Sequence, residues 1–392
     1  MLPARCWVVQ HTIQQCTLCL LLVVASQTAI AARLPVIQHL YVALSTNAHR
    51  VPATSDLRVK TGASITGWLV VEAHYRGKTV YFSDAPQVRH RGKRRNTEVW
   101  SADAFGPMAL QVFKVEPVIP ASGLYDNTGT LDHTVDVDAQ THHPGGWHWC
   151  PIEYVETEVG DPTAHWSFRL NSQPSVGPRQ HDYGTMRYSI RVMWRKQTYW
   201  SAGKAHRDKS GVLPGVTTVR VRRDNTAVGY MTELMNVPYV YGSSSPTGKL
   251  RDHQTERAVG ADCADLVVYG WRRAGQNIGY TWSQGLKSHT YLTARVTDLV
   301  DGRYQQSLGR SPRFGHEVQV GDIILWRRHV AVIVEVDETG VLTPQTKILH
   351  TLSEAPRLTT LSRIGFRFDA PPFDIRRPRW ERKRRVSIRH SR

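Results

Sequence analysis

The chain is poor in cysteine, and its few cysteines are unevenly placed. Five occur in 392 residues, and Cys6, Cys16 and Cys19 lie within the first twenty positions. If that segment is removed, only Cys150 and Cys263 remain, which is too few for a fold held together by a disulfide framework. A single disulfide between these two is an alternative, although they fall in different predicted domains.

Acidic residues are also in the minority. Asp plus Glu number 33 against 50 Lys plus Arg, which gives a formal net charge of +17. Such an excess predicts attraction to polyanions without specifying which kind. The composition is 41% hydrophobic and 21% charged, which is typical of a globular chain, and the length allows two domains with cores of their own.

Long apolar runs are missing beyond the N-terminus, so no internal membrane helix is expected. The N-terminus has the pattern of a secretion signal, with Arg5, an apolar stretch at 16–25 and small residues at Ala29 and Ala31. We therefore predict a signal peptide over 1–32 and no transmembrane segment after its removal. The mature protein is expected to be secreted, periplasmic or held in the cell envelope; an uncleaved anchor helix is the alternative.

Residues 33–225 predict a β-rich, sandwich-like domain. Short runs of alternating apolar and polar residues are separated by Gly, Pro, Asn and Asp, and there is no repeat period. Strands are expected at 66–73, 77–82, 108–118, 131–137, 152–159, 165–170 and 186–194. No enzyme motif occurs in this region, so we expect a binding or positioning role for it.

Two clusters within this domain have an open interpretation. The basic segment 89–95 is either a docking site for an anionic polymer or a solvated loop. The second cluster contains His142, His143, His148 and Cys150. Its spacing matches no established zinc motif, so the sequence predicts a loop packed by aromatic residues and no metal site.

Residues 226–370 have a different character. A short helix is predicted at 227–235, and an apolar run over Cys263–Arg273 predicts a longer one. Strands rich in Val, Ile and Leu follow at 321–326, 330–336 and 346–352. Helices followed by an antiparallel sheet indicate an α+β domain.

Cys263 falls at the first turn of the longer helix. The unpaired N–H groups and the positive end of a helix favour a thiolate over a thiol, so a reactive cysteine is predicted. His329 precedes one strand and His350 lies on the next, an order that is typical of papain-like cysteine hydrolases. His289 and His316 are expected at the surface, with either as a rival base.

Several segments, taken together, resemble the NlpC/P60 family of cell-wall peptidases. They are residues 239–242, 262–267, 321–324, 329–332 and 349–350. The resemblance covers roughly residues 230–355 and implies a small papain-type fold without a cofactor. It also implies a secreted hydrolase that cleaves amide bonds in peptidoglycan stem peptides. The expected partner is peptidoglycan or another anionic envelope polymer, and no nucleic acid is expected.

The resemblance implies catalytic roles for three residues. Cys263 corresponds to the nucleophile, His329 to the general base and His350 to the residue that orients the base. If the two histidine strands form one antiparallel hairpin, their imidazoles can be neighbours. Arg327 and Arg328 directly precede His329, and we expect their charge to lower its pKa.

Three more residues are implied on the substrate side. Tyr241 matches the family tyrosine beside the nucleophile, and Asp262 and Asp265 are expected to bind substrate. Ser243 and Asp265 depart from the family pattern, because the family has glycine at both positions. The polar segment 244–259 is longer than expected and predicts a lid or a pocket wall.

Two alternatives to a peptidoglycan hydrolase stay open. One is a related thiol hydrolase or acyltransferase that acts on another amide or ester, and it keeps a reactive Cys263. The other is a catalytically inactive envelope-binding protein, which does not.

The C-terminal residues 371–392 form a predicted basic tail. From position 376 onward they contain eight Arg and one Lys against one Glu. Such a run is expected to be disordered and solvated, or to act as an electrostatic tether to anionic polymers.

Overall fold

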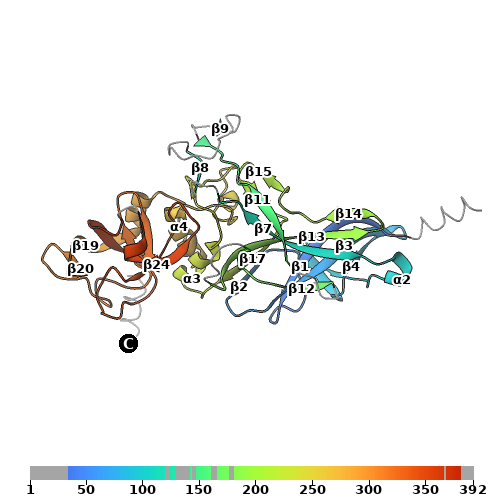
Figure 1. Ribbon diagram of the computed structural model, residues 1–392, viewed down its shortest axis with the longest axis horizontal. Helices are drawn as coiled ribbons and strands as arrows, with labels where there is room; N and C mark the ends of the chain where they lie inside the picture. The colour runs from blue at the N-terminus through green and yellow to red at the C-terminus, as the bar shows by residue number, and fades with distance from the viewer. Residues whose placement is uncertain are drawn as a thin grey trace, which may run out of the picture.

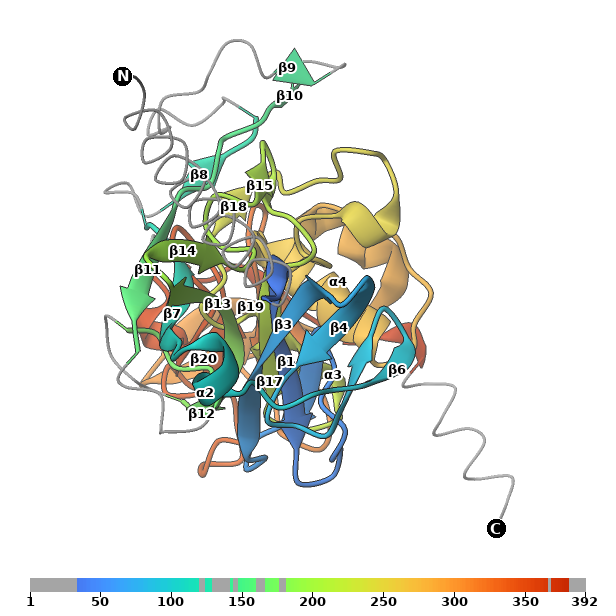
Figure 2. The ribbon, with the colours of Figure 1, turned by 90° about the vertical axis from the view of Figure 1, so that its right-hand side faces the viewer.

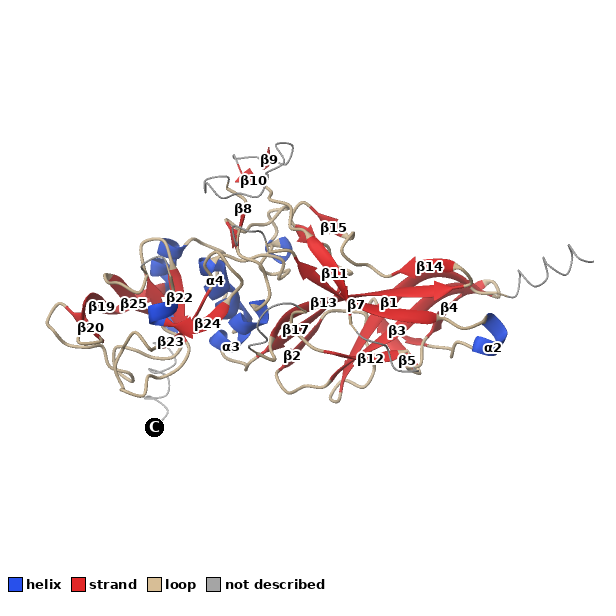
Figure 3. Ribbon diagram, in the orientation of Figure 1, coloured by secondary structure: helices blue, strands red, loops and turns tan. Residues whose placement is uncertain are grey.

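The computed structural model describes residues 34–119, 124–128, 142–143, 147–159, 166–175, 181–365 and 368–380. The predicted signal peptide and the strand expected at 131–137 lie outside these residues, as do the side chains of the histidines in the cluster before Cys150. The described chain is an α+β structure dominated by strands (Figures 1 and 3). None of its described helices has the length and apolar character needed to cross a membrane.

Two main sheets build the N-terminal domain. One contains β1 (Val36–Thr46), β3 (Ile65–Tyr75), β4 (Lys78–Phe82) and β12 (Ser167–Leu170). The other contains β11 (Tyr154–Glu158), β7 (Ala109–Pro117), β13 (Gly184–Trp194), β14 (Gln197–Trp200), β17 (Thr217–Arg222) and β2 (Leu57–Lys60). The predicted hairpin of β3 and β4 is confirmed, since the two strands pair antiparallel.

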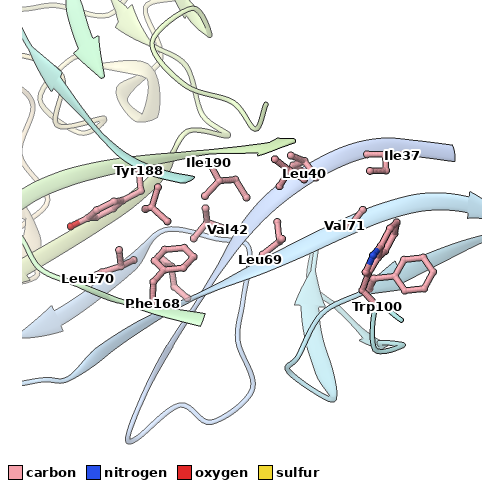
Figure 4. Packing of buried hydrophobic residues seen from close by; sticks show 14 of the residues in the cluster. Ile37, Leu40, Val42, Leu69, Val71, Trp100, Phe168, Leu170, Tyr188 and Ile190 are labelled. Carbon is pink, nitrogen blue, oxygen red and sulfur yellow. The ribbon is translucent and has the colours of Figure 1, made fainter. Parts of the chain in front are cut away.

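Side chains from both sheets fill one core. Leu69 and Val71 on β3 belong to the same buried cluster as Val112 on β7 and Ile190 on β13. Figure 4 shows strands on either side of this layer of aliphatic and aromatic side chains. The alternation in the sequence therefore marks the inward faces of two packed sheets, and the N-terminal region is rich in strands.

Short elements complete this domain. They are β5 (Gln87–His90), β6 (Lys93–Asn96), α2 (Ala102–Phe105), β8 (Tyr125–Asp126), β9 (His142–His143), β10 (Trp147–His148), β15 (Arg207–Asp208) and β16 (Gly211–Val212).

The C-terminal domain begins with helices and ends with a sheet, as the sequence predicts. Its first elements are α3 (Ala227–Met231), η2 (Thr232–Leu234), β18 (Val240–Tyr241), η3 (Leu250–Asp252), α4 (Cys263–Arg273) and η4 (Ser283–His289). The antiparallel sheet has the order β20 (Arg303–Gln306), β19 (Thr290–Val300), β25 (Phe373–Pro378), β21 (Ile323–Leu325), β22 (Val330–Ile333), β23 (Lys347–His350) and β24 (Arg357–Thr360). The short helix η5 (Leu361–Arg363) follows.

Helix α4 covers the predicted range, and it is buried along most of its length. Gly270 lets it pack closely against α3, because a Cβ there would lie 2.3 Å from Met231 Cγ and 2.5 Å from the Ala227 carbonyl oxygen. The helix therefore lies between α3 and the sheet, and its first residue is Cys263.

The predicted basic tail at 371–392 begins too early. Residues Phe373–Pro378 form β25, which pairs with β19 on one side and β21 on the other. Arg377 on this strand donates from Nε to Asp322 Oδ1 and from Nη2 to Asp322 Oδ2, each at 2.8 Å. Arg377 is 4% exposed, so its charge is part of the core of the domain and not of a solvated tail.

The two domains are joined by more than a linker. Strand β18 of the second domain pairs parallel with β8 of the first. The segment 244–259, for which a lid or a pocket wall is expected, packs on the N-terminal domain through its second half, whereas residues 247–251 are exposed. Arg187 Nη2 donates to the Ala258 carbonyl oxygen at 2.5 Å, and Arg220 Nη1 donates to that of Glu256 at 2.8 Å.

Replacement of Arg377 by Gln is expected to lower the free energy of unfolding by about 3–5 kcal/mol, because it leaves the Asp322 carboxylate buried without its cation. Urea unfolding monitored by tryptophan fluorescence measures the effect. Arg379→Gln is the matched control, since Arg379 lies two residues further on and is exposed. Equal stabilities of the two variants would contradict the role assigned to the buried pair.

Candidate functional site

Cys263 is the first residue of α4, as the sequence predicts. Asp262 is the N-cap, and its Oδ1 accepts hydrogen bonds from the backbone N–H groups of Ala264 and Asp265, both at 2.9 Å. Cys263 and Cys150 are both free cysteines and both buried, so the alternative of a disulfide between them is excluded in this structure.

The environment of the Cys263 thiol favours the protonated form. Burial raises its pKa, and the nearby negative charge of Asp262 raises it further. Hydrogen bonding by the backbone N–H groups of Val330 and Ala264 acts in the opposite direction but is weaker. The expectation of a thiolate stabilised by the helix N-terminus is therefore wrong for this conformation, because desolvation outweighs the helix end.

His329 and His350 are brought together, as expected for neighbouring strands. Strands β22 and β23 pair antiparallel with Val332 opposite Leu349, which makes the two histidines diagonal neighbours. Their ring centroids are 5.4 Å apart and the rings are nearly perpendicular. Both side chains are fully buried.

Cys263 is not brought to this pair. Trp326 and His329 flank a two-residue turn, since Leu325 pairs with Val330 and the Trp326 N–H donates to the His329 carbonyl oxygen at 3.0 Å. The two rings therefore lie on one face of the sheet, 5.6 Å apart and stacked. Within the described residues, neither ring nitrogen of His329 has a hydrogen-bond partner.

The opposite face of the same strands packs against the nucleophile. Val330 and Val332 belong to the buried cluster that contains Cys263, whereas Ala331 and Ile333 belong to the cluster that contains Trp326. Because side chains alternate along a strand, the sheet separates the imidazoles from the thiol. No hydrogen bond joins the predicted nucleophile to the predicted general base among the described residues.

Both imidazoles are held neutral. Burial lowers the pKa of His329 well below its usual value, and the neighbouring His350 adds to this because two positive charges side by side are unfavourable. Burial also lowers the pKa of His350 to about 3, assisted by Arg357, whose Nε donates to His350 Nε2 at 3.3 Å. The expected influence of the two arginines before His329 is not the cause, because both are exposed.

The two departures from the family pattern contact each other. The Ser243 hydroxyl donates to Asp265 Oδ2, and Thr255 Oγ1 lies 3.4 Å from the same oxygen. Burial raises the pKa of Asp265 well above its usual value, and the charge of Asp262 raises it further. Burial likewise raises the pKa of Asp262, to about 6, against hydrogen bonds from backbone N–H groups.

These contacts give both aspartates structural roles, which the sequence did not predict. Asp262 caps α4, and Asp265 is 4% exposed, which leaves little surface for a substrate. Sequence analysis missed Thr255, because a lone threonine in a polar segment carries no signal of a buried carboxyl partner 10 residues further along.

The tyrosine expected at the site is exposed. Tyr241 on β18 is 37% exposed and is available to a ligand. Tyr239, two residues earlier, is buried, and its pKa is raised by burial and by the nearby Cys263 and Asp262. The segment 239–242 contains Tyr239 as well as Tyr241, and this is the sequence signal that could have identified Tyr239. Tyr239 therefore lies closer to the buried cysteine environment than sequence analysis indicates.

Among the described residues, no recorded contact joins the two rival histidines to the predicted catalytic residues. His316 is exposed, and His289 is half-buried at the end of η4. No group of three or more His, Cys, Asp or Glu side chains suited to a metal ion occurs among the described residues.

A cavity of about 700 Å³ lies between the two domains. Val155, Tyr183 and Met186 of the N-terminal domain line it together with Glu354 and Arg357 of the C-terminal domain. Arg357 also contacts His350, so one side chain connects this cavity with the imidazole pair. The volume is within the range of small-molecule sites.

Comparisons of the chain with protein-family models, with curated proteins and with solved structures gave no match. The resemblance to NlpC/P60 peptidases therefore rests on the motifs alone.

Replacement of Asp265 by Asn is expected to stabilise the protein at pH 7.5 but not at pH 3.5. The pKa of Asp265 is raised on folding, so the wild type loses stability as the pH rises above the unfolded value of about 4. A neutral amide avoids this loss. Thermal unfolding at several pH values measures the difference in Tm.

Asp298→Asn is the control, because Asp298 is exposed and its replacement is expected to leave the Tm difference independent of pH. A lower Tm for Asp265→Asn at pH 7.5 than for the wild type would show that the carboxyl is needed in its charged form.

Proposed function

We propose that this protein is a cysteine hydrolase of the cell envelope that cleaves amide bonds in peptidoglycan stem peptides. The observation that carries the proposal is the position of Cys263 as the first residue of a capped helix packed on an antiparallel sheet whose strands bring in His329 and His350. A cysteine at a helix start beside a sheet that supplies histidines is suited to nucleophilic catalysis.

The proposed reaction follows the usual course of thiol hydrolysis. His329 removes the thiol proton, and the Cys263 sulfur attacks the amide carbonyl carbon. The backbone N–H of Cys263 stabilises the oxyanion. The C–N bond then breaks, His329 protonates the leaving amine, and water hydrolyses the thioester to a carboxylic acid and the free thiol.

This reaction requires a different arrangement of the turn before β22. The Val330 N–H contacts the thiol, so the backbone of His329 is only one residue away. A shift of one residue in a strand moves its side chains to the other face, and the turn residues Arg327 and Arg328 are exposed. We therefore infer that the competent state has His329 turned towards Cys263.

One observation favours a second candidate, a catalytically inactive envelope-binding protein. The thiol is buried and protonated, and no imidazole lies within hydrogen-bonding distance of it among the described residues. A protein that keeps this arrangement in the presence of substrate has no base for the thiol. A thiol hydrolase or acyltransferase that acts on another amide or ester uses the same residues as the first proposal and differs in substrate.

The wild type is expected to release peptide fragments from purified peptidoglycan, and Cys263→Ala to reduce the rate at least a thousandfold, because the nucleophile is lost. Mass spectrometry of the soluble fraction measures the fragments. Cys150→Ala is the matched control, since Cys150 is the other free, buried cysteine. It is expected to retain activity in proportion to its folded fraction.

A second comparison separates the candidates. If His329 is the base, His329→Ala abolishes both fragment release and the substrate-dependent alkylation of Cys263 by iodoacetamide, while His350→Ala lowers them less. Fragment release by Cys263→Ala equal to that of the wild type would refute the assignment of the nucleophile. No release by any variant on peptidoglycan or on model amides and esters, together with an unreactive Cys263, supports the binding protein instead.

A further inference from the structure

The basic segment of the N-terminal domain is an ordered hairpin. Strands β5 and β6 pair antiparallel, with Arg89 directly opposite Arg94. The hairpin is fixed to the rest of the domain, because the Arg89 N–H donates to the Pro52 carbonyl oxygen at 2.7 Å and the Thr54 N–H donates to that of Arg89 at 3.0 Å. In Figure 2, β6 lies at the periphery of the molecule. The alternative of a solvated loop at 89–95 is therefore wrong about the backbone, which forms two paired strands.

The hairpin concentrates positive charge at the surface. Its exposed cations are Arg89, Arg91, Lys93, Arg94 and Arg95. None of the five forms an ion pair within the described part of the chain. Like charges directly opposite each other on neighbouring strands are unfavourable, so the Arg89–Arg94 pair reduces the stability of the isolated hairpin.

The outer face of the hairpin also presents amide groups. Val88 and His90 are buried, so the alternating Gln87 and Arg89 point outward. Their cross-strand partners are Asn96 and Arg94, and Gln87 Nε2 donates to Asn96 Oδ1 at 2.9 Å. Two guanidinium groups beside two amides form one surface of donors with amide acceptors at its edge.

The carboxylate of Glu72 lies below the hairpin, and its oxygen atoms are engaged. Glu72 on β3 accepts a hydrogen bond from the Tyr41 hydroxyl at 2.8 Å, and it also interacts with the Tyr81 hydroxyl. Arg95 lies over the Tyr81 ring, 5.8 Å from its centroid. The local charge therefore remains strongly positive after Glu72 is counted.

We propose that the outer face of the β5–β6 hairpin docks a linear anionic polymer that carries hydroxyl groups, with phosphate or carboxylate in its repeat. Guanidinium groups bind phosphate and carboxylate oxygens in a bidentate manner. The two amides supply the donors and acceptors that hydroxyl groups need. On the outer face of β6 the alternate residues Arg94 and Asn96 are about 6.6–6.8 Å apart, so one repeat of an extended ligand can meet a guanidinium group and an amide.

This inference deepens the proposed function, because such a surface holds a cell-wall hydrolase at its substrate. The inference depends on the proposed function only where it places the polymer in the cell wall. Binding requires neither Cys263 nor the histidines, so the two proposals can fail separately. Tests of binding therefore use the full chain with Cys263→Ala, which cannot act by the proposed mechanism.

The test measures binding of fluorescent poly(glycerol phosphate) and of a polyuronic acid across a range of salt concentrations. Arg89→Gln/Arg94→Gln is expected to weaken binding of at least one polymer about tenfold or more at low salt and to reduce the slope of log Kd against log salt by about two. Lys196→Gln/Lys204→Gln removes the same charge from two exposed positions beside β14 and is expected to change Kd less than threefold.

Two further variants define the chemistry. Arg89→Lys/Arg94→Lys keeps the charge but loses the bidentate geometry, and an intermediate Kd is expected. Gln87→Ala/Asn96→Ala is expected to weaken the hydroxylated polymers but not polyacrylate, which has no hydroxyl groups. Unchanged Tm values show that these exposed replacements leave the fold intact.

The possible results of these binding measurements lead to different conclusions. Preference for one of the two polymers identifies phosphate or carboxylate as the anionic group. Equal weakening by the two double-Gln variants would show attraction to net charge alone and overturn the proposal. Tighter binding to single-stranded nucleic acid of equal charge would also overturn it. Binding without fragment release from peptidoglycan leaves this inference standing and removes the hydrolase.

Discussion

Two arginines buried between the domains determine where the candidate nucleophile lies. A guanidinium group stays charged in proteins and carries five N–H donors, so a buried one requires acceptors. Arg187 and Arg220 extend from strands of the N-terminal domain and find carbonyl oxygens of residues 256–258. The chain then has only a few residues before Cys263 begins α4. The β-rich domain therefore positions the start of α4. It does so through the segment 244–259, which is longer than the family pattern predicts.

Local sequence signals predicted much of this structure. The apolar run over Cys263–Arg273 predicted the bounds of α4, because the buried face is encoded within the helix itself, whereas the capping role of Asp262 was not predicted. The Val- and Ile-rich strands around His329 and His350 were also predicted, although they are shorter than expected. The positions of Cys263 and Asp265 on α4, and of His350 on β23, therefore followed from the sequence alone, whereas the strand that carries Tyr241 was not predicted.

Long-range pairings were not predictable in the same way. Arg377 belongs to a basic run, and only its partner Asp322, 55 residues earlier, makes it a core residue. The face on which His329 lies depends on a two-residue turn, and a change of one residue there reverses the outcome. Ser243 and Asp265 each seemed a separate departure from the family pattern, whereas the fold brings them into one hydrogen bond. Burial likewise reversed the expected effect of the helix end on the thiol.

The position of β25 has a consequence for how the protein is made. This strand lies between β19 and β21, although it is the last strand of the described chain. The two neighbours are separated in sequence by only a short stretch, yet they cannot form the native sheet until residues 373–378 have left the ribosome. The domain that contains Cys263 therefore completes its sheet only after this strand has been made, and a nascent chain that stops before it lacks the strand that joins β19 to β21.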